Sequence, residues 1–225
     1  MTRAIEFYRS ALGKKVLMAA SGVLLFGFVL IHMLGNLKLY QGPEKLNAYA
    51  GWLRELGAPA LPHEGALWLA RIVLLAAVVV HADAAWKLTL ANRRARPVSY
   101  KKAERAVASY ASRTMLIGGV IVAAFVIYHL LHLTLGTVHP GFDREDVYRN
   151  VVSGFQVPLV SLFYVVANLL LGMHLYHGLW SMFQTLGLND SGREGWRRWF
   201  AILFAALITL GNVSFPLAVL LGAVS

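Results

Sequence analysis

The sequence predicts an all-α membrane protein in which five transmembrane helices form one bundle. The chain has 225 residues, of which 58% are hydrophobic and 14% are charged, and its mean hydropathy is +0.59. A soluble domain of this size needs a larger polar surface. Five segments also reach the length of about 20 mostly apolar residues that a spanning helix needs. The segments between them are short, so we expect a single transmembrane domain over residues 1–225.

The five spans are expected in the following order along the chain. They lie at about residues 16–34, 66–90, 114–135, 157–183 and 199–224. The second span is the least uniform, because it contains Arg71, His81, Asp83 and Lys87. It still qualifies as a span, since it is long and its charged residues lie towards its ends.

The basic residues between the spans are distributed unevenly. They concentrate in the N-terminal segment and in the loops after the second and fourth spans, whereas most acidic residues lie in the other two loops. Because Lys and Arg mark the cytoplasmic side, we expect the N-terminus in the cytoplasm and the C-terminus outside. The first 15 residues are polar and basic, so no cleavable signal peptide is expected. The prediction is a multi-pass protein of a bacterial cytoplasmic membrane.

The composition also excludes several kinds of site and partner. The chain has no cysteine, which excludes disulfides, iron–sulfur clusters held by thiolates, and covalently attached haem. Its formal net charge of +10 could suggest nucleic acid. In a membrane protein, such a charge more often reflects basic cytoplasmic loops that contact anionic lipid. We therefore expect lipid and no nucleic acid as a partner.

Histidines are the main candidates for a functional site. His63 and His139 lie in expected outer loops, so we expect them at the surface; the other six lie inside spans, where ionisable residues are costly and often functional. At a rise of about 1.5 Å per residue, His32 and His129 lie about 24 and 22 Å from the inner ends of their spans. His81 and His174 each lie about 14 Å from an inner end. Depth thus predicts an outer pair, His32 and His129, and an inner pair, His81 and His174.

Two facing neutral imidazoles are what six-coordinate haem requires, with one nitrogen of each ring on iron and the other held by a hydrogen bond. Without cysteine, such a haem is b-type. A zinc site would need three or four ligands at one depth. The alternative is that the histidines hydrogen-bond between helices or line a polar cavity. Spacing alone does not decide between His129 and His132, or between His174 and His177, as the ligand. Glycines in the same spans leave room for close helix packing or a flat macrocycle, namely Gly22, Gly27, Gly118, Gly119 and Gly172.

Four segments give the chain a family resemblance. They are "SGVLLFGFVLIHMLGNL", "VVVHADAAWKL", "VIYHLLHLTLG" and "GMHLYHGLWSMFQTLG", one from each of the first four spans. In this order, across residues 16–187, they resemble the cytochrome b membrane anchor of succinate dehydrogenase and fumarate reductase, in its single-polypeptide, five-helix, di-haem form. The fifth span has no histidine, as in that family.

The resemblance implies a function and a set of partners. His32, His81, His129 and His174 match the axial ligands of two haem b groups, paired first helix with third and second with fourth. The anchor would hold an FAD-containing flavoprotein subunit and an iron–sulfur subunit, and would pass electrons to or from membrane quinone, with menaquinone expected. It would perform no dicarboxylate chemistry itself, and a higher oligomer is left open. The alternatives are a di-haem b subunit of a hydrogenase or formate dehydrogenase, and a haem-free anchor or proton-relaying transporter.

Several other residues are candidates for contacts to haem propionates or quinone. The cations at the span ends are Lys14, Lys15, Lys38, Arg71, Lys87 and Arg113, with Arg71 preferred because no acid lies close by in its span. Their alternative role is to anchor helices at lipid head groups. The quinone candidates are Ser21, His132, His177 and Trp180. Ser21 could instead bond to its own helix, and Trp180 could belong to an interfacial aromatic belt. Asp83 and Lys87 have the spacing of an ordinary ion pair.

Overall fold

The computed structural model describes the backbone of residues 6–8, 10–94, 106–185 and 194–225. Side chains are described for these residues except 106–114, 185 and 194. The helices in chain order are α2 (Ala11–Asn36), the 3-10 helix η1 (Leu37–Gln41), α3 (Pro43–Arg54), α4 (Gly65–Arg94), α5 (Ala106–His129), the π-helical turn η2 (Leu130–Thr134), α6 (Val147–Phe155), α7 (Pro158–Thr185) and α8 (Glu194–Leu220). The described residues contain no strand.

Five of these helices are long and apolar enough to cross a membrane, which confirms the predicted fold class. They are α2 with η1, α4, α5 with η2, α7 and α8. The boundaries differ from the expected ones by a few residues. The first helix begins earlier, because the Ser10 side chain accepts a hydrogen bond from the Gly13 amide and caps it. The last helix ends earlier, at a turn in which Gly222 has a φ of +72°.

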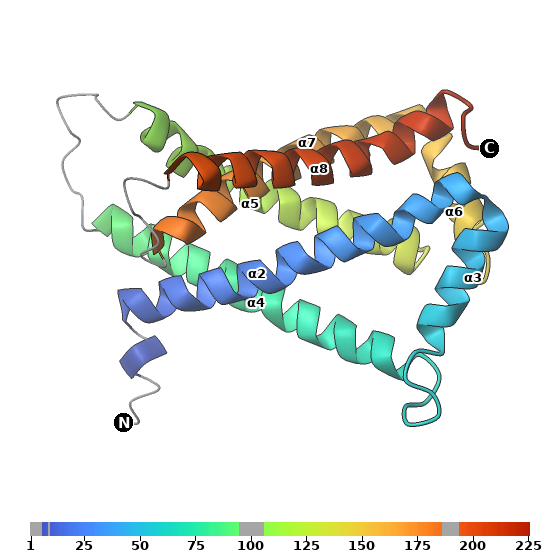
Figure 1. Cartoon of the computed structure of the whole chain (residues 1–225), viewed down its shortest axis with the longest axis horizontal. Helices are drawn as coiled ribbons and strands as arrows, with labels where there is room; N and C mark the ends of the chain where they lie inside the picture. Colours follow the sequence, from blue (N-terminus) through green and yellow to red (C-terminus); the bar gives the residue numbers. More distant parts are fainter. Residues whose placement is uncertain (1–5, 9, 95–105, 186–193) are drawn as a thin grey trace.

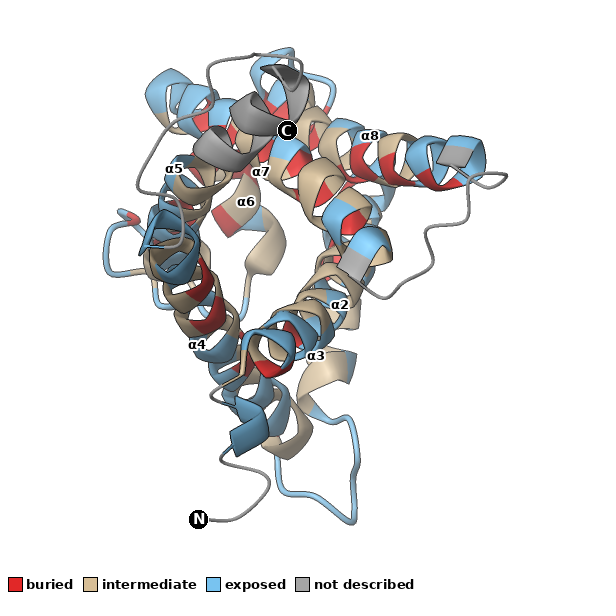
Figure 2. Cartoon of the chain, turned by 90° about the vertical axis from the view of Figure 1, so that its left-hand side faces the viewer, coloured by how far each residue is buried: buried red, intermediate tan, exposed pale blue. Residues whose placement is uncertain are grey.

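The long helices run antiparallel to their neighbours in sequence and surround a common centre. Figure 1 shows α2 beside α4, and α7 beside α8, with α5 on the other side of α7. Viewed from the end, the helices α2, α4, α5 and α7 form a ring, with α8 outside α7 (Figure 2). Close packing of α7 on α8 depends on Gly172, where a methyl group would collide with the side chain of Thr209.

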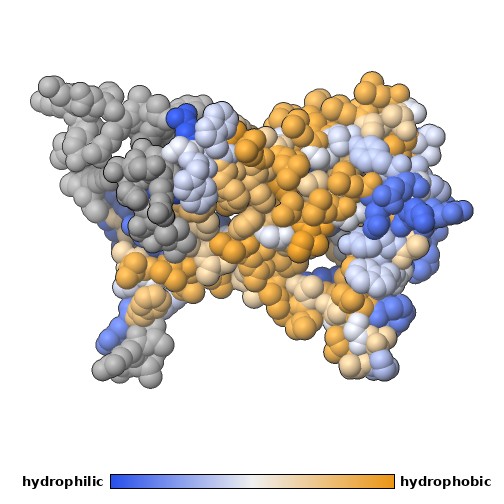
Figure 3. Space-filling view, in the orientation of Figure 1, coloured by the Kyte–Doolittle hydropathy of each residue, from blue (hydrophilic) through white to orange (hydrophobic). Residues whose placement is uncertain are grey.

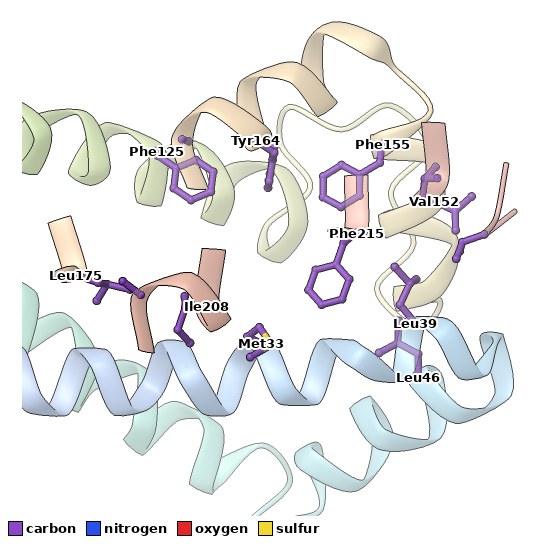
Figure 4. Packing of buried hydrophobic residues seen from close by; sticks show 14 residues of the cluster. Met33, Leu39, Leu46, Phe125, Val152, Phe155, Tyr164, Leu175, Ile208 and Phe215 are labelled. Atoms are coloured by element: carbon purple, nitrogen blue, oxygen red, sulfur yellow. The ribbon is translucent and has the colours of Figure 1, made fainter. Parts of the chain in front are cut away.

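A buried apolar cluster occupies the half of the bundle that lies towards α3 and α6 (Figure 4). Met33 and Ile208 are each 1% exposed and join α2 to α8 at this level. Further along, Leu39 and Leu46 of η1 and α3 meet Val152 of α6 in the same cluster. Among the described residues, the other half of the bundle has fewer buried apolar side chains, so the described packing is densest at the end of α3 and α6.

The outward faces of the spans are apolar. Large aliphatic side chains such as Ile31, Leu75, Ile117, Leu162 and Leu210 are exposed. Figure 3 shows these faces as an apolar belt, with hydrophilic residues gathered at the end formed by α3 and α6. Such a belt suits the hydrocarbon of a bilayer, because no water is needed to solvate it.

The two short helices α3 and α6 close one end of the bundle, which we call the capped end (Figure 1). From the sequence, these two connections were expected to be loops, whereas each contains a short helix. Pro43 at the start of α3 suits a first helical turn, and Asp146 caps α6 by accepting from the Arg149 amide. Asn47 joins the two helices, because its amide group donates to Asp146 at 2.9 Å and accepts from the Tyr148 amide at 3.0 Å.

An ion-pair cluster fastens the start of α4 to the capped end. Glu64 is 6% exposed and accepts a hydrogen bond from Arg144 at 2.8 Å. Arg54 and Arg71 lie within 3.8 and 3.6 Å of the same carboxylate. The hydrogen bond and charge of Arg144, with the charge of Arg71, lower the pKa of Glu64 against the opposing effect of burial. Glu64 therefore stays ionised and ties three segments together.

Candidate functional site

The structure brings the four central histidines together as two facing pairs. In the outer pair, the rings of His32 on α2 and His129 at the end of α5 have centroids 5.8 Å apart, at 88° to each other. In the inner pair, the rings of His81 on α4 and His174 on α7 have centroids 6.3 Å apart, at 66°. All four side chains are half-buried. Each pair joins two helices that are not consecutive spans, and the two pairs share no helix.

The outer pair lies among aromatic side chains. The ring of Phe28 stacks on His32 at 5.3 Å, and the ring of Phe125 lies 5.9 Å from that of His129. The hydroxyl of Tyr164 is 3.4 Å from His129 Nδ1. The same hydroxyl is 3.0 Å from His132 Nδ1.

The inner pair lies among backbone atoms and small residues. His81 Nδ1 is 3.2 Å from the carbonyl oxygen of Met18 and 3.3 Å from the hydroxyl of Ser21. Ser21 donates to the carbonyl of Leu17 at 2.7 Å. This bond within its own helix is the alternative to a quinone contact that the sequence indicated for Ser21. His174 Nδ1 is buried and makes no hydrogen bond among the described residues.

Glycines lie against both rings of the inner pair. A β-carbon at Gly22 would lie 3.4 Å from His81 Cε1, and one at Gly119 would lie 3.5 Å from His174 Cε1. A larger side chain at either position would press on the imidazole. The α2 and α5 backbones thus lie against a pair whose imidazoles belong to α4 and α7.

The residues present fit a metal-centred macrocycle at each pair. A metal–imidazole bond is about 2 Å long, so rings with centroids 5.8 and 6.3 Å apart leave room for one metal atom between them. The bond between His81 Nδ1 and the Met18 carbonyl leaves the opposite nitrogen, Nε2, available. Within the described residues, no group of three or more His, Cys, Asp or Glu side chains could hold a metal ion, which disfavours a zinc-type site.

His132 and His139 form a third histidine cluster at the capped end. Their rings stack with centroids 4.7 Å apart, and they are 3% and 6% exposed. His139 Nε2 is 3.0 Å from the hydroxyl of Ser153, and the backbone of Gly154 lies so close that a β-carbon there would be 2.7 Å from His132 Cε1. Burial, with the charge of Arg149, lowers the pKa of His139.

The expected surface position of His139 is therefore wrong. Gly136, with a φ of +72°, turns the chain after η2, and the His139 amide donates back to the carbonyl of Gly136 at 3.1 Å. The turn carries His139 under α6 rather than into solvent. His63, by contrast, is exposed and pairs with Glu55 at 2.7 Å.

The candidate cations lie at the two ends of the bundle. Arg71 was expected to have no acid close by in its own span; its carboxylate neighbour at 3.6 Å is Glu64, which precedes the span. The guanidinium also lies 4.8 Å from the ring of Trp68. Lys87 pairs with Asp83 at 2.8 Å, as the spacing predicted. The Lys38 ammonium lies 5.4 Å from the centroid of the Tyr49 ring. Lys14 and Lys87 line a cavity of about 490 Å³, together with Tyr8, Leu90, Ala91 and Arg94.

The remaining candidates are less constrained. Lys15 on α2 is exposed, whereas His177 and Trp180 on α7 are half-buried. The ring of His177 lies beside that of Tyr176. The side chain of Arg113 lies outside the described residues.

Tyr164 was not singled out from the sequence. A tyrosine inside a span is nevertheless a signal of a functional or structural contact, because its hydroxyl needs a hydrogen-bond partner there.

The fold and the site define a class: a multi-pass helical membrane protein with two facing histidine pairs between its helices. Residues 89–213 match the family described as the succinate dehydrogenase/fumarate reductase transmembrane subunit. This is more than half of the chain, which therefore belongs to that family. The match includes His129 and His174, one member of each pair. Searches of curated proteins and of solved structures find no match.

Proposed function

We propose that this chain is the di-haem cytochrome b anchor of a succinate:quinone oxidoreductase. The observation that carries the proposal is the arrangement of the outer and inner pairs, with ring centroids 5.8 and 6.3 Å apart on four different helices. His32 with His129, and His81 with His174, would each hold one haem b through axial nitrogens. Haem held by two histidines supplies one-electron redox chemistry.

The chain's own residues would orient and enclose these groups. Tyr164 and the Met18 carbonyl lie within hydrogen-bond distance of Nδ1 of His129 and His81, which would leave Nε2 of each ring for iron. Gly22 and Gly119 keep the inner rings free of neighbouring side chains. Lys14, Lys87 and Arg94, around the cavity at the uncapped end, supply cations for propionates of the inner haem.

The partners and orientation follow from the family and from charge. We propose that the uncapped end faces the cytoplasm, because the basic connections lie there. An FAD-containing flavoprotein subunit and an iron–sulfur subunit would dock at this end, and electrons would pass between the iron–sulfur subunit and quinone, with menaquinone as the expected species. His132, His177, Ser21 and Trp180 stay candidates for quinone contacts.

A haem assay on the purified complex tests the proposal. A pyridine haemochrome titration, with a reduced-minus-oxidised spectrum, should give two b haems per chain. One haem per chain would contradict the di-haem form. None, in a complex that retains its soluble subunits, would leave the chain as a haem-free anchor.

A further inference from the structure

Tyr164 contacts a histidine of the outer pair and a histidine outside it. Its side chain is 3% exposed and comes from α7, whereas His129 and His132 lie on α5 and η2. The hydroxyl lies 3.4 Å from His129 Nδ1 and 3.0 Å from His132 Nδ1. No other hydrogen bond to either Nδ1 occurs in the described part of the chain. One buried hydroxyl therefore serves both rings.

The directions of these two hydrogen bonds depend on each other. A hydroxyl has one proton to donate and two lone pairs. If His129 gives its Nε2 to a metal, its Nδ1 carries the proton and can only donate, so the Tyr164 oxygen accepts from His129. The Tyr164 proton is then directed at His132 Nδ1, which accepts. His132 thereby fixes the orientation in which Tyr164 can accept from His129.

In the described residues, no tyrosine hydroxyl reaches Nδ1 of either inner histidine. His81 Nδ1 faces the backbone carbonyl of Met18 and the Ser21 hydroxyl, and His174 Nδ1 has no partner among the described residues. A contact from a tyrosine to a ligand nitrogen is therefore a property of the outer pair. It is the feature that a single substitution can remove at one pair without touching the other.

We propose that Tyr164 is a positioning residue that lowers the redox potential of the outer haem by accepting a hydrogen bond from His129, with His132 holding its hydroxyl in place. The inference rests on the proposed function. An acceptor on Nδ1–H makes the imidazole a stronger donor. A stronger axial donor favours ferric over ferrous iron and so lowers the potential.

The test is an optical redox titration of the intact complex carrying Tyr164→Phe. The substitution removes the hydroxyl and keeps the ring. We expect a tenfold shift of the ferric–ferrous equilibrium towards ferrous at the outer haem, which corresponds to about 59 mV upward for one electron, with the inner haem unchanged. The same variant on a His81→Ala background, which lacks an inner ligand, assigns the shifted transition to the outer haem.

Tyr128→Phe is the matched control. Tyr128 stacks on His132 at 5.4 Å, and its hydroxyl makes no hydrogen bond within the described residues, so its loss should leave both potentials unchanged. Unchanged potentials in Tyr164→Phe, or equal shifts of both haems, would overturn the inference.

If Tyr164→Phe loses the outer haem, Tyr164→Gln is the second variant, because its side-chain amide restores an acceptor. Recovery of the outer haem at a lowered redox potential supports the inference, and failure to recover this haem overturns it. Absence of haem from the unaltered complex would instead overturn the proposed function.

Discussion

The outer and inner pairs use the same residue type in different surroundings. The outer pair lies among the rings of Phe28, Phe125 and Tyr164, next to the densely packed capped end. The inner pair lies against Gly22 and Gly119, nearer the uncapped end, where fewer of the described residues are buried. Side chains therefore shape the first site, and backbone shapes the second.

This difference teaches which changes each site can accept. A hydroxyl can be removed from the outer pair with a modest change in volume, as in Tyr164→Phe, because the aromatic ring stays in place. The inner pair has little to remove, whereas a side chain larger than a methyl group at Gly22 or Gly119 would press on its imidazoles. Substitutions can therefore separate the two pairs, and the following predictions are ordered by the size of the expected effect.

The largest effect is expected from His81→Ala. Because the two pairs share neither a residue nor a helix, this change should remove the inner haem and leave the outer one, halving the haem content per chain. The measurement is haem per chain in the purified complex, with His63→Ala as the control because His63 is exposed. Loss of both haems from a folded complex would contradict the pairing.

An intermediate effect is expected from Gly154→Ala at the capped end. The added methyl group would lie 2.7 Å from His132 Cε1 and 3.1 Å from His139 Cε1, which forces the stacked rings apart. Overpacking of this kind costs about 1–3 kcal/mol, so the Tm of the purified complex should fall by several degrees.

Gly51→Ala provides the control for that change. Gly51 lies in α3, at the same end, and a β-carbon there has no neighbour within 4 Å. Its replacement should leave the Tm unchanged or raise it slightly, since alanine favours a helix. Equal falls in both variants would mean that the capped end is generally fragile, rather than closely packed around the two histidines.

The smallest effect is expected from Glu64→Gln, and it should depend on pH. The pKa of Glu64 lies below its ordinary value of 4.5 in the folded chain, so its contribution to stability is complete above that value and is lost as the pH falls through the lowered pKa. The variant should have a lower Tm at neutral pH, and the difference should shrink in acid.

Glu55→Gln is the matched control for the pH series. Glu55 and its partner His63 are both about 60% exposed, and exposed ion pairs contribute little. Its Tm should follow that of the unaltered protein at every pH. A difference between Glu64→Gln and the unaltered protein that stays constant from neutral to acid pH would show that the charge of Glu64 is not what fastens α4.

The spans could be predicted because crossing a bilayer requires length and apolarity, and both are visible in the sequence. The expected span at residues 157–183 corresponds to Pro158–Thr185, for example. The helices α3 and α6 were missed because they are short and partly polar, although Pro43 and Asp146 are ordinary start signals. The side of the membrane assigned to each end of the bundle is inferred from the distribution of charged residues alone.

The candidate site was predictable in part. Counting residues from the inner ends of the spans matched His32 with His129 and His81 with His174, since a helix has a fixed rise. The same counting could not place His139, because its burial depends on a turn at Gly136 and on the backbone of Gly154 in α6. The depth of a residue along the five spans predicts neither contact. Counting could not find Tyr164 either. To pair a tyrosine on α7 with a histidine on α5, one must know which face each helix turns towards the other.

The π-helical turn gives two neighbouring histidines different partners. Residues three apart in an α-helix lie on nearly the same face, and His129 and His132 would then compete for one position. The turn at Leu130–Thr134 instead closes with the Leu135 amide donating to the carbonyl of Leu130 at 2.8 Å, so it accommodates one residue more than an α-turn. Such single π-turns inside α-helices are frequent at functional sites. The wider turn thus lets two imidazoles three residues apart reach different partners: His129 faces His32, and His132 stacks on His139.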